Sequence, residues 1–275
     1  MSADILVQLA AFIERHPRLL VLTGAGMSTA SGIPDYRDKD GVRRGTPPVQ
    51  GPEFRKSDAV RRRYWARSMV GYPHLARAQP NDGHKALAAL QERALVDSIM
   101  TQNVDGLHQQ AGSEDVLELH GNIHSVLCLE CRATFSREHI QHRLVLENPQ
   151  MRAIQAQSLP DGDARLEPEA LSSFKVPCCV HCGGMLQPHV VFFGDGVPAE
   201  RSRQAIDSME RADSLLIIGS SLIVFSGFRF CRMAAAAGKP IAAINQGKTR
   251  ADDMFALKIA DSAEQVLPAL LARLS

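Results

Sequence analysis

The sequence predicts a doubly wound α/β fold, a parallel sheet with helices on both faces, carrying a small cysteine-rich insert and a loop-and-helix insert. Three observations support this prediction. Helical patterns alternate with short, continuously apolar runs, small or polar residues follow those runs, and two Cys-x-x-Cys pairs occupy a segment that breaks the alternation. Buried parallel strands have this continuous apolar character because helices cover both faces of their sheet.

Four helix-then-strand units carry the alternation. Each begins with apolar residues at helical spacing and ends in a short apolar strand. The predicted pairs are a helix from 5 to 13 with a strand from 19 to 22, a helix from 81 to 93 with a strand from 95 to 100, a helix from 199 to 211 with a strand from 215 to 218, and a helix ending at Gly238 with a strand from 241 to 244.

Length and composition limit the possible classes of protein. The chain has 275 residues, which fits one large domain with an insert or two modest domains. Hydrophobic residues make up 45% and charged residues 22%, and the net charge is +1, with 31 basic against 30 acidic residues. These values exclude a disordered, fibrous or membrane-spanning chain and disfavour nucleic acid as the main partner. No basic leader opens the sequence, so we expect a cytoplasmic protein, and we expect a monomer.

Two segments do not follow the alternation. Residues 38–53 are rich in Gly, Pro, Arg and Lys, which predicts a mobile loop, and a helix is expected at about 58–70. Residues 123–184 hold the cysteine pairs and a polar stretch at 155–169 without a core-forming pattern. We therefore expect a large domain over 1–122 and 185–275, with a loop and helix insert at about 38–80, and a small module over 123–184.

The cysteines predict a structural metal site. Two knuckles, each a pair of thiolates two residues apart, can complete the tetrahedral sulfur coordination that zinc prefers. The predicted ligands of one zinc per chain are Cys128, Cys131, Cys179 and Cys182. Cys178 and His181 form an interleaved alternative, ranked second because Gly183-Gly184 suits the turn after Cys182. Cys231 is expected to be a small buried hydrophobe.

Small and hydrogen-bonding residues follow the predicted strands. In an open, Rossmann-like parallel sheet, ligands bind outside the carboxyl ends of the strands, so these residues are candidates for a binding site. They are Thr23, Gly24, Ala25 and Gly26; Thr101, Gln102, Asn103 and Asp105; His120 and Gly121; Gly219, Ser220 and Ser221; and Asn245 and Gly247.

Two of these positions have alternative interpretations. Gly24 and Gly26 would let the backbone approach a phosphate, with a helix starting over 27–31, but the spacing is not G-x-G-x-x-G and an ordinary tight turn is the alternative. A lone His120 would be satisfied by backbone carbonyls. Beside Asn103 and Asp105, its imidazole is suited to accept a proton at physiological pH.

Several motifs together resemble the sirtuins, the NAD-dependent protein lysine deacylases. They are the segment from Thr23 to Arg37, Thr101-Gln102-Asn103-Val104-Asp105, Leu119-His120-Gly121 and Gly219-Ser220-Ser221. Within the family the sequence is most similar to the class II, mitochondrial sirtuin-4-like branch. That similarity rests on Pro34-Asp35-Tyr36-Arg37, Arg63-Tyr64-Trp65-Ala66-Arg67 and Val190-Val191-Phe192-Phe193-Gly194-Asp195.

The resemblance implies a reaction and a set of site residues. The acyl-lysine oxygen would displace nicotinamide from NAD, and the acyl group would leave as O-acyl-ADP-ribose, with free lysine released. His120 would be the base, assisted by Asn103 and Asp105. The implied NAD site lies within 24–44, including Gly24, Ala25, Gly26, Asp35, Tyr36 and Arg37, and adds Gln102, Asn103, Asp105, Gly219, Ser220, Ser221, Asn245, Gln246, Gly247 and Ala263.

The same resemblance implies an acyl-lysine protein as substrate. Its peptide would add as a strand to a segment made of Val190, Val191, Phe192, Phe193 and Gly194, although this apolar run equally fits a core strand. Tyr64 and Arg67, three residues apart on one helix, would hold an acidic acyl group, with a loop over 70–79 shaping the pocket. The chain departs from many sirtuins at Ser226-Gly227, where Pro-Ala is common, and this bears on peptide fit.

Two other functions compete with the deacylase. A protein ADP-ribosyltransferase would use the same NAD site, because both reactions expel nicotinamide. A non-catalytic NAD-sensing protein with a zinc ribbon would use the Arg61-Arg62-Arg63 run as a phosphate contact. A solvated helix face is the more usual explanation of such a run, and the near-zero net charge gives no nucleic-acid footprint.

Overall fold

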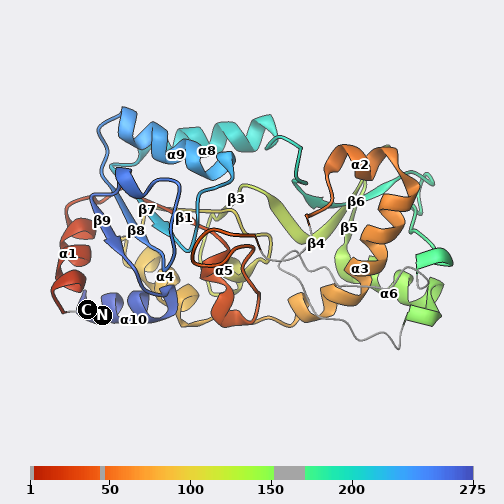
Figure 1. Ribbon diagram of the computed structural model, residues 1–275, viewed down its shortest axis with the longest axis horizontal. Coiled ribbons are helices and arrows are strands. Elements are labelled where there is room, and N and C mark those ends of the chain that lie inside the picture. The colour runs from red at the N-terminus through yellow and green to blue at the C-terminus, as the bar shows by residue number, and fades with distance from the viewer. Residues whose placement is uncertain (1–2, 44–46, 152–170, 275) are drawn as a thin grey trace.

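The structure is a computed structural model that describes residues 3–43, 47–151 and 171–274. Two predictions fall outside these residues: the polar stretch at 155–169 and the end of the expected NAD segment at Arg44. The chain folds into a large layered unit and a smaller unit that lie side by side along the long axis (Figure 1). No helix in the described residues is both long and apolar enough to cross a membrane.

A six-stranded parallel sheet forms the centre of the large unit. Its strand order is β3-β2-β1-β7-β8-β9, so β1 and β7 meet where the order of the chain reverses. The strands are β1 (Leu19–Thr23), β2 (Ser98–Thr101), β3 (Leu117–Glu118), β7 (Ser214–Ile218), β8 (Ile241–Ile244) and β9 (Leu257–Ile259). This arrangement confirms the predicted doubly wound fold and identifies the β1–β7 junction as the expected ligand-binding point.

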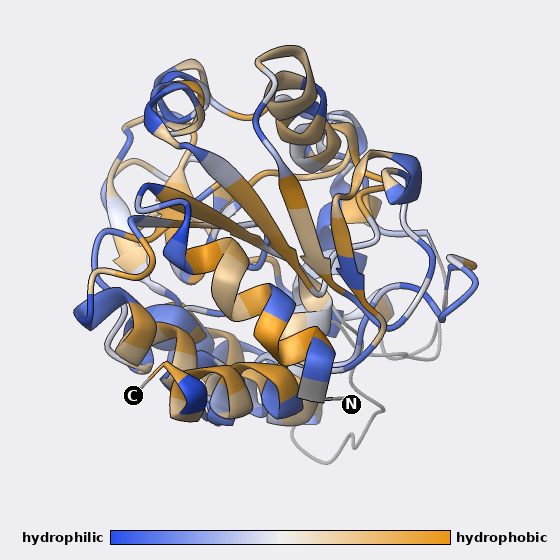
Figure 2. Ribbon diagram, turned by 90° about the vertical axis from the view of Figure 1, so that its left-hand side faces the viewer, coloured by the Kyte–Doolittle hydropathy of each residue, from blue (hydrophilic) through white to orange (hydrophobic). Residues whose placement is uncertain are grey.

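Helices cover both faces of this sheet, and the alternation of side chains along each strand explains the apolar runs. In β1, Leu19 and Val21 pack into one core, while Leu20 and Leu22 pack into the core on the opposite face. The first core is closed by α1 (Ala3–Glu14), α4 (Asp82–Glu92) and α10 (Ala263–Arg273), and the second by α8 (Ala199–Arg211) and α9 (Phe225–Ala236). Figure 2 shows the hydrophobic strands between these helical layers.

The smaller unit is built on an antiparallel sheet with strand order β5-β4-β6. Its strands are β4 (Gly121–Cys128), β5 (Thr134–Ser136) and β6 (Leu186–Val190), and its helices are α2 (Gly51–Lys56), α3 (Asp58–Ala76) and α6 (Arg137–Glu147). One hydrophobic core joins residues of all these helices with β4 and β6. The small unit therefore takes in chain on both sides of 123–184 and includes the helix expected as a separate insert.

Four local predictions differ from the structure. Residues 27–31 do not start an α-helix, because two 3₁₀ turns, Ala25–Met27 and Thr29–Ser31, end at left-handed Gly32 (φ 82°). The loop expected at 70–79 is mostly helix, since α3 continues through Pro73 and buries Tyr72 and Leu75. Burial of those two side chains offsets the cost of proline inside a helix.

The third error concerns the expected strand over 190–194. Strand β6 ends at Val190, after which Val191 donates its backbone N–H to the carbonyl oxygen of His120 at 2.7 Å. Phe193 then pairs with Gln50 in an isolated parallel bridge. The expected loop over 38–53 likewise ends early, because α2 begins at Gly51 with Pro52 in its first turn.

Candidate active site

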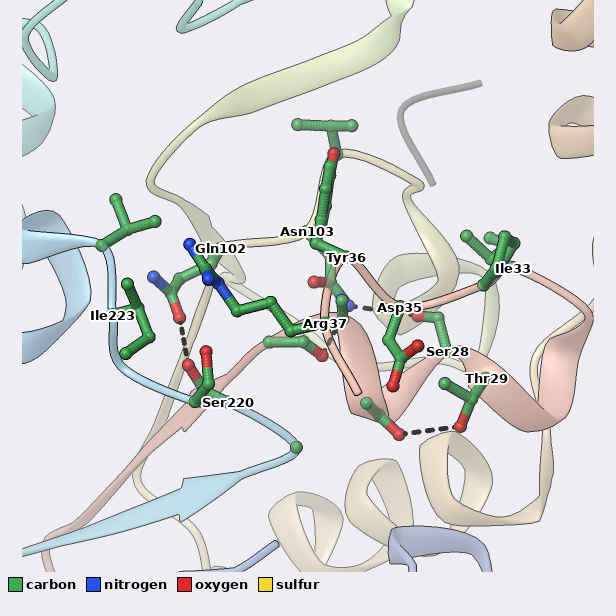
Figure 3. A pocket seen from close by; sticks show the side chains of 18 of the residues that line it. Ser28, Thr29, Ile33, Asp35, Tyr36, Arg37, Gln102, Asn103, Ser220 and Ile223 are labelled. Atoms are coloured by element: carbon green, nitrogen blue, oxygen red, sulfur yellow. Dashed lines mark hydrogen bonds between the residues drawn. The ribbon is translucent and has the colours of Figure 1, made fainter. Parts of the chain in front are cut away.

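A cavity of about 280 Å³ lies at the carboxyl ends of the large sheet, between the two units. Its walls come from the loops after β1, β2, β7 and β8, from the start of α10, and from β6 and the segment that follows it. Figure 3 shows side chains from the first loops converging on this space, including Asp35, Tyr36, Arg37 and Asn103. Most of the strand-end residues singled out by sequence thus share one cavity, whereas Thr23, Thr101 and Gly121 do not line it.

The glycines of the β1 loop are required by a contact with the β7 loop. A Cβ atom on Gly24 would lie 2.8 Å from the Ser220 Cβ, and one on Gly26 would lie 2.8 Å from the Gly219 Cα. Gly219 has φ of +61°, and Gly26 donates its N–H to the Gly219 carbonyl at 2.8 Å. The two loops can therefore come this close only because glycines occupy the contact positions. This contact explains why the spacing of Gly24 and Gly26 differs from the usual G-x-G-x-x-G motif.

Asn103 and Asp105 are held by one buried serine. Ser28 donates its hydroxyl to Asp105 Oδ2 at 2.7 Å, and Asn103 Nδ2 donates to Ser28 Oγ at 3.1 Å and to the Gly24 carbonyl at 3.0 Å. The backbone N–H of Leu107 reaches Asp105 Oδ1 at 3.0 Å. Burial raises the pKa of Asp105, while the hydrogen bonds from Leu107 and Ser28 oppose that rise.

His120 is fixed through both ring nitrogens. Nδ1 lies 2.9 Å from the Gln102 carbonyl oxygen, and Nε2 lies 2.8 Å from the Ser226 hydroxyl. Burial is the main cause that lowers the pKa of His120, and the positive charges of Arg201 and Arg229 lower it further against the opposing effect of the Gln102 carbonyl. A neutral imidazole at the cavity wall is suited to accept a proton.

Gln102 ties two predicted segments together. Its Oε1 accepts the Ser220 hydroxyl at 2.6 Å, so the side chain that follows β2 reaches the loop after β7 (Figure 3). The same residue supplies the carbonyl that holds Nδ1 of His120. Gln102 therefore links the loop after β7 to the candidate base.

Most of the predicted site residues line the cavity. Every residue named for the NAD site does so, from Gly24 to Ala263, as do His120, Tyr64 and Val190 to Phe193. Gly194 and Arg67 are not among the lining residues. Sequence reasoning did not name Leu75 and Ile123, which form an apolar part of the lining together with Ile33 of the expected 24–44 segment. These three residues come from distant parts of the chain.

Tyr64 lies within an aromatic cluster at the side of the cavity formed by the segment after β6. Its ring centroid is 5.3 Å from that of Phe54 and 5.1 Å from that of Phe192. Phe192 is only 6% exposed and belongs to the core of the small unit, as the alternative interpretation of this segment expected. Val191 and Phe193, on either side of it, also line the cavity, so the segment has both a core and a cavity role.

A second hydrogen-bonded path crosses between the units and was not expected from sequence. Tyr72 of α3 lies with its hydroxyl 3.2 Å from His124 Nδ1, and His124 Nε2 lies 2.9 Å from the Asp105 carbonyl oxygen. Arg137, fully buried, places its guanidinium 4.2 Å from the centroid of the Tyr72 ring. The backbone of Asp105 is thus braced by the small unit.

Four cysteines form the only group of three or more His, Cys, Asp or Glu residues in the described chain that is arranged to hold a metal ion. The sulfur atoms of Cys128, Cys131, Cys179 and Cys182 lie within 4.8 Å of one another. Cys128 and Cys182 are 3.6 Å apart, and Cys131 and Cys179 are 3.7 Å apart. Tetrahedral zinc with Zn–S bonds of about 2.3 Å places its sulfurs roughly 3.8 Å apart, so the group fits zinc.

The remaining cysteines also have clear positions. Cys178 is exposed and outside the group of four, so the arrangement favours the first-ranked set of ligands over the interleaved alternative. Cys231 is completely buried in the core beneath α9, as predicted. Since all four positions of a tetrahedral ion would be filled by protein, the metal has a structural role.

Comparison with known proteins identifies the family. Residues 24–226 match the model of the Sir2 family. The chain belongs to the Sir2 family. Among curated Sir2 relatives, the "NAD-dependent protein deacetylase" of Bordetella bronchiseptica is 52% identical over 259 residues, covering 94% of both chains. The "NAD-dependent protein deacetylase 3" of Pseudomonas syringae pv. tomato is 52% identical over 256 residues, covering 93% of this chain and 91% of that protein.

Solved Sir2 structures share the fold along nearly the whole chain. A Sir2 variant with deacetylated p53 peptide and 3′-O-acetyl-ADP-ribose has a TM-score of 0.79 and 27% identity, covering 98% of both chains. A Sir2 complex with p53 peptide and NAD⁺ has a TM-score of 0.75 and 26% identity, covering 97% of both chains. The resemblance noted from sequence motifs is confirmed at the level of the family.

Proposed function

We propose that this Sir2 protein is an NAD-dependent protein lysine deacylase that releases nicotinamide and O-acyl-ADP-ribose. The observation that carries the proposal is the single cavity that joins the β1–β7 junction to His120 and to the segment after β6. One wall has the glycine backbone and polar groups suited to a dinucleotide, and the opposite wall has the apolar character of a lysine side chain. The deacetylase names of the relatives and the acetyl-ADP-ribose complex support it.

NAD fits the polar side of the cavity. The close contact of Gly24 and Gly26 with the β7 loop leaves only backbone along that edge, and Asn245, Gln246 and Gly247 continue it. When bound, NAD supplies a ribose carbon whose bond to nicotinamide is labile, and the acyl oxygen of the substrate replaces nicotinamide there. The protein holds these two groups in line and excludes water, which lowers the entropic barrier to their reaction.

Three residues have distinct parts in this scheme. Asn103 and Asp105, fixed by Ser28, orient the nicotinamide ribose and favour the positive charge that develops on it. His120 takes a proton from a ribose hydroxyl when that oxygen attacks the acyl carbon. Its lowered pKa keeps the imidazole neutral and able to accept that proton near pH 7.

We also propose that the chain belongs to the class II, sirtuin-4-like branch and prefers acidic acyl groups. The support is the Arg63-Tyr64-Trp65-Ala66-Arg67 segment, in which Tyr64 lines the cavity and Arg67 follows one turn later on the same helix. A phenol with a guanidinium can hold a carboxylate. The acyl-lysine protein partner belongs to this proposal, and the expected cytoplasmic location and monomeric state stay predictions.

The decisive experiment compares His120→Ala with wild-type protein. Each protein is incubated with NAD and a panel of acyl-lysine peptides, the products are weighed, and NAD binding is measured by calorimetry. We expect His120→Ala to bind NAD but to form little deacylated peptide, while the exposed control His142→Ala behaves as wild type. Near-normal turnover by His120→Ala would refute the mechanism.

The same mass measurement separates the alternatives. A protein substrate that gains the mass of ADP-ribose would identify a transferase, and binding of NAD without any product would identify a sensor. The structure removes one argument for the sensor, because Arg61 donates to the Phe54 and Arg55 carbonyls and Arg62 donates to Asp58. Those guanidinium groups cap the neighbouring helix and pair within the protein.

A further inference from the structure

The residues at which the chain departs from many sirtuins, Ser226 and Gly227, both contact the machinery around His120. They begin the helix α9, and Ser226 lies 106 residues from His120 along the chain. The Ser226 hydroxyl is 2.8 Å from His120 Nε2. A Cβ atom on Gly227 would lie 2.5 Å from Gln102 Nε2, so any larger residue there would force the Gln102 side chain to shift.

The hydrogen bonds of His120 assign its tautomer. The Gln102 carbonyl oxygen can only accept, so Nδ1 carries the hydrogen and donates at 2.9 Å. In a neutral imidazole Nε2 then holds the lone pair, and the Ser226 hydroxyl donates to it. Ser226 and Gln102 therefore form hydrogen bonds with the two nitrogens of the ring. Gly227 leaves space for the side chain of Gln102.

We propose that Ser226 is a positioning residue for deacylation, which orients the His120 ring and steadies it when Nε2 takes a proton from the substrate. The inference rests on the proposed role of His120 as base. When the substrate binds, the Ser226 hydroxyl gives up the single lone pair of Nε2 to the ribose hydroxyl. After the proton has moved from the ribose hydroxyl to Nε2, the Ser226 oxygen accepts from the new N–H, with its own hydrogen turned away. No bond to Ser226 forms or breaks.

The surroundings of His120 make such a partner necessary. Arg201 of α8 and Arg229 of α9 place positive charge near the ring, the Gln102 carbonyl is the opposing dipole, and burial disfavours the charged imidazole. Arg229 is itself tied to α8 by a hydrogen bond from Nη1 to Ser202 Oγ at 3.0 Å. A hydroxyl contributes more to a charged imidazolium than to a neutral ring, because hydrogen bonds to charged groups are the stronger.

Ser226→Ala tests the proposal through pH dependence. Loss of the hydroxyl removes a stronger bond from the imidazolium than from the neutral ring, so the pKa of His120 falls in the variant. We expect the acid limb of kcat/KM for deacylation to move down by about 0.5 to 1 pH unit, and kcat to fall about tenfold. The dissociation constant of NAD should stay within about twofold of wild type, because Ser226 contacts the ring of His120 and not the loop that carries Gly24 and Gly26.

Two further variants separate positioning from general damage. Ser226→Thr keeps the hydroxyl and should restore the acid limb, and the control Ser208→Ala removes a hydroxyl on α8 that accepts from Arg211 and should leave the whole profile unchanged. A structural defect alone would lower the rate equally at every pH. An acid limb that does not move in Ser226→Ala, or moves upward, would overturn the proposal.

An NMR titration of the His120 ring distinguishes this inference from the proposed function. In Ser226→Ala the pKa of His120 should fall, whether or not His120 is the base. If both the titration and the rate profile stay as in wild type, the Ser226 proposal fails while the deacylase assignment stands. If the titration shifts but the rate profile does not, His120 is not the base, and the positioning role falls with it.

Discussion

The rings of His84 and His108 lie 4.9 Å apart, and both side chains are fully buried beneath the carboxyl ends of β1 and β2. His108 Nε2 is 2.8 Å from Thr23 Oγ1, which donates to Thr101 Oγ1 at 2.8 Å, and Thr101 accepts the backbone N–H of Asn103 at 3.0 Å. The histidine pair is thus connected to a residue of the candidate active site through two threonines at the ends of β1 and β2.

This pair predicts loss of stability in mild acid. Burial lowers the pKa of His84 to about 4 and that of His108 to about 3, against an unfolded value of 6.5. The unfolded chain therefore binds more protons than the folded chain between these values, so stability falls as pH drops below about 6.5. At pH 5 each histidine should cost about 2 kcal/mol relative to pH 7, as measured by denaturant unfolding.

A variant isolates the contribution of one ring. In His84→Gln the loss of stability between pH 7 and pH 5 should shrink by about 2 kcal/mol, because the titrating group is gone. The exposed histidine in His142→Gln should leave the pH dependence as in wild type. The same slope in all three proteins would show that other groups determine the acid sensitivity.

The cysteine cluster predicts one zinc per chain. Cys179→Ser should lose the metal, because three thiolates leave the tetrahedral site incomplete, and the small unit should become more sensitive to proteolysis. Its neighbour supplies the matched control: Cys178→Ser changes an exposed thiol outside the cluster and should keep the zinc. Metal analysis of the purified proteins checks both. Full zinc retention in Cys179→Ser would contradict the assigned ligands.

Ser28 offers a test of how the side of the cavity around Asn103 and Asp105 is organised. Removing its hydroxyl in Ser28→Ala takes one donor from Asp105 and one acceptor from Asn103. The pKa of Asp105, already raised by burial, should rise further, so activity should be lost at a higher pH as the solution is acidified. We expect kcat/KM to fall about tenfold to a hundredfold at pH 7. An unchanged pH profile would show that Ser28 does not determine the ionisation of Asp105.

The parts predicted correctly from sequence were those specified by local chemistry. The central strands β1, β7 and β8 are short, largely apolar runs because both faces of the sheet are covered there, and each cysteine knuckle is a Cys-x-x-Cys pair. Polar residues after the strands had to share one edge once the sheet was parallel. These features need only short stretches of chain to be recognised.

The parts that were missed depend on contacts between distant segments. No local signal indicates that Ser226 meets His120, or that Tyr72 reaches His124, because each pair becomes adjacent only when the units pack together. Residues 70–79 were expected to form a loop, whereas burial of Tyr72 and Leu75 keeps α3 continuous through Pro73. Tertiary packing outweighed the local preference in that case.

The last prediction concerns the acyl group, and it depends on Tyr64 and Arg67. Tyr64 lines the cavity with its ring packed against those of Phe54 and Phe192, and Arg67 lies one turn further along α3, partly buried. If the guanidinium reaches the end of the acyl chain, it supplies a charged hydrogen bond to a dicarboxylic group and nothing comparable to acetyl. Succinyl and glutaryl peptides should then be better substrates than acetyl peptides.

Arg67→Ala should therefore lower kcat/KM on succinyl-lysine peptides, through a loss of about 1.5 to 3 kcal/mol of transition-state stabilisation. It should leave kcat/KM on acetyl-lysine peptides nearly unchanged. Arg67→Lys should restore only part of the loss, because an ammonium cannot form the bidentate pair that a guanidinium makes with a carboxylate. Tyr64→Phe removes the hydroxyl but keeps the ring in its aromatic cluster, so it should lower the rate on the acidic peptides alone. Equal losses on both peptides in Arg67→Ala would instead assign Arg67 to the fold of α3, and the acidic preference would be withdrawn.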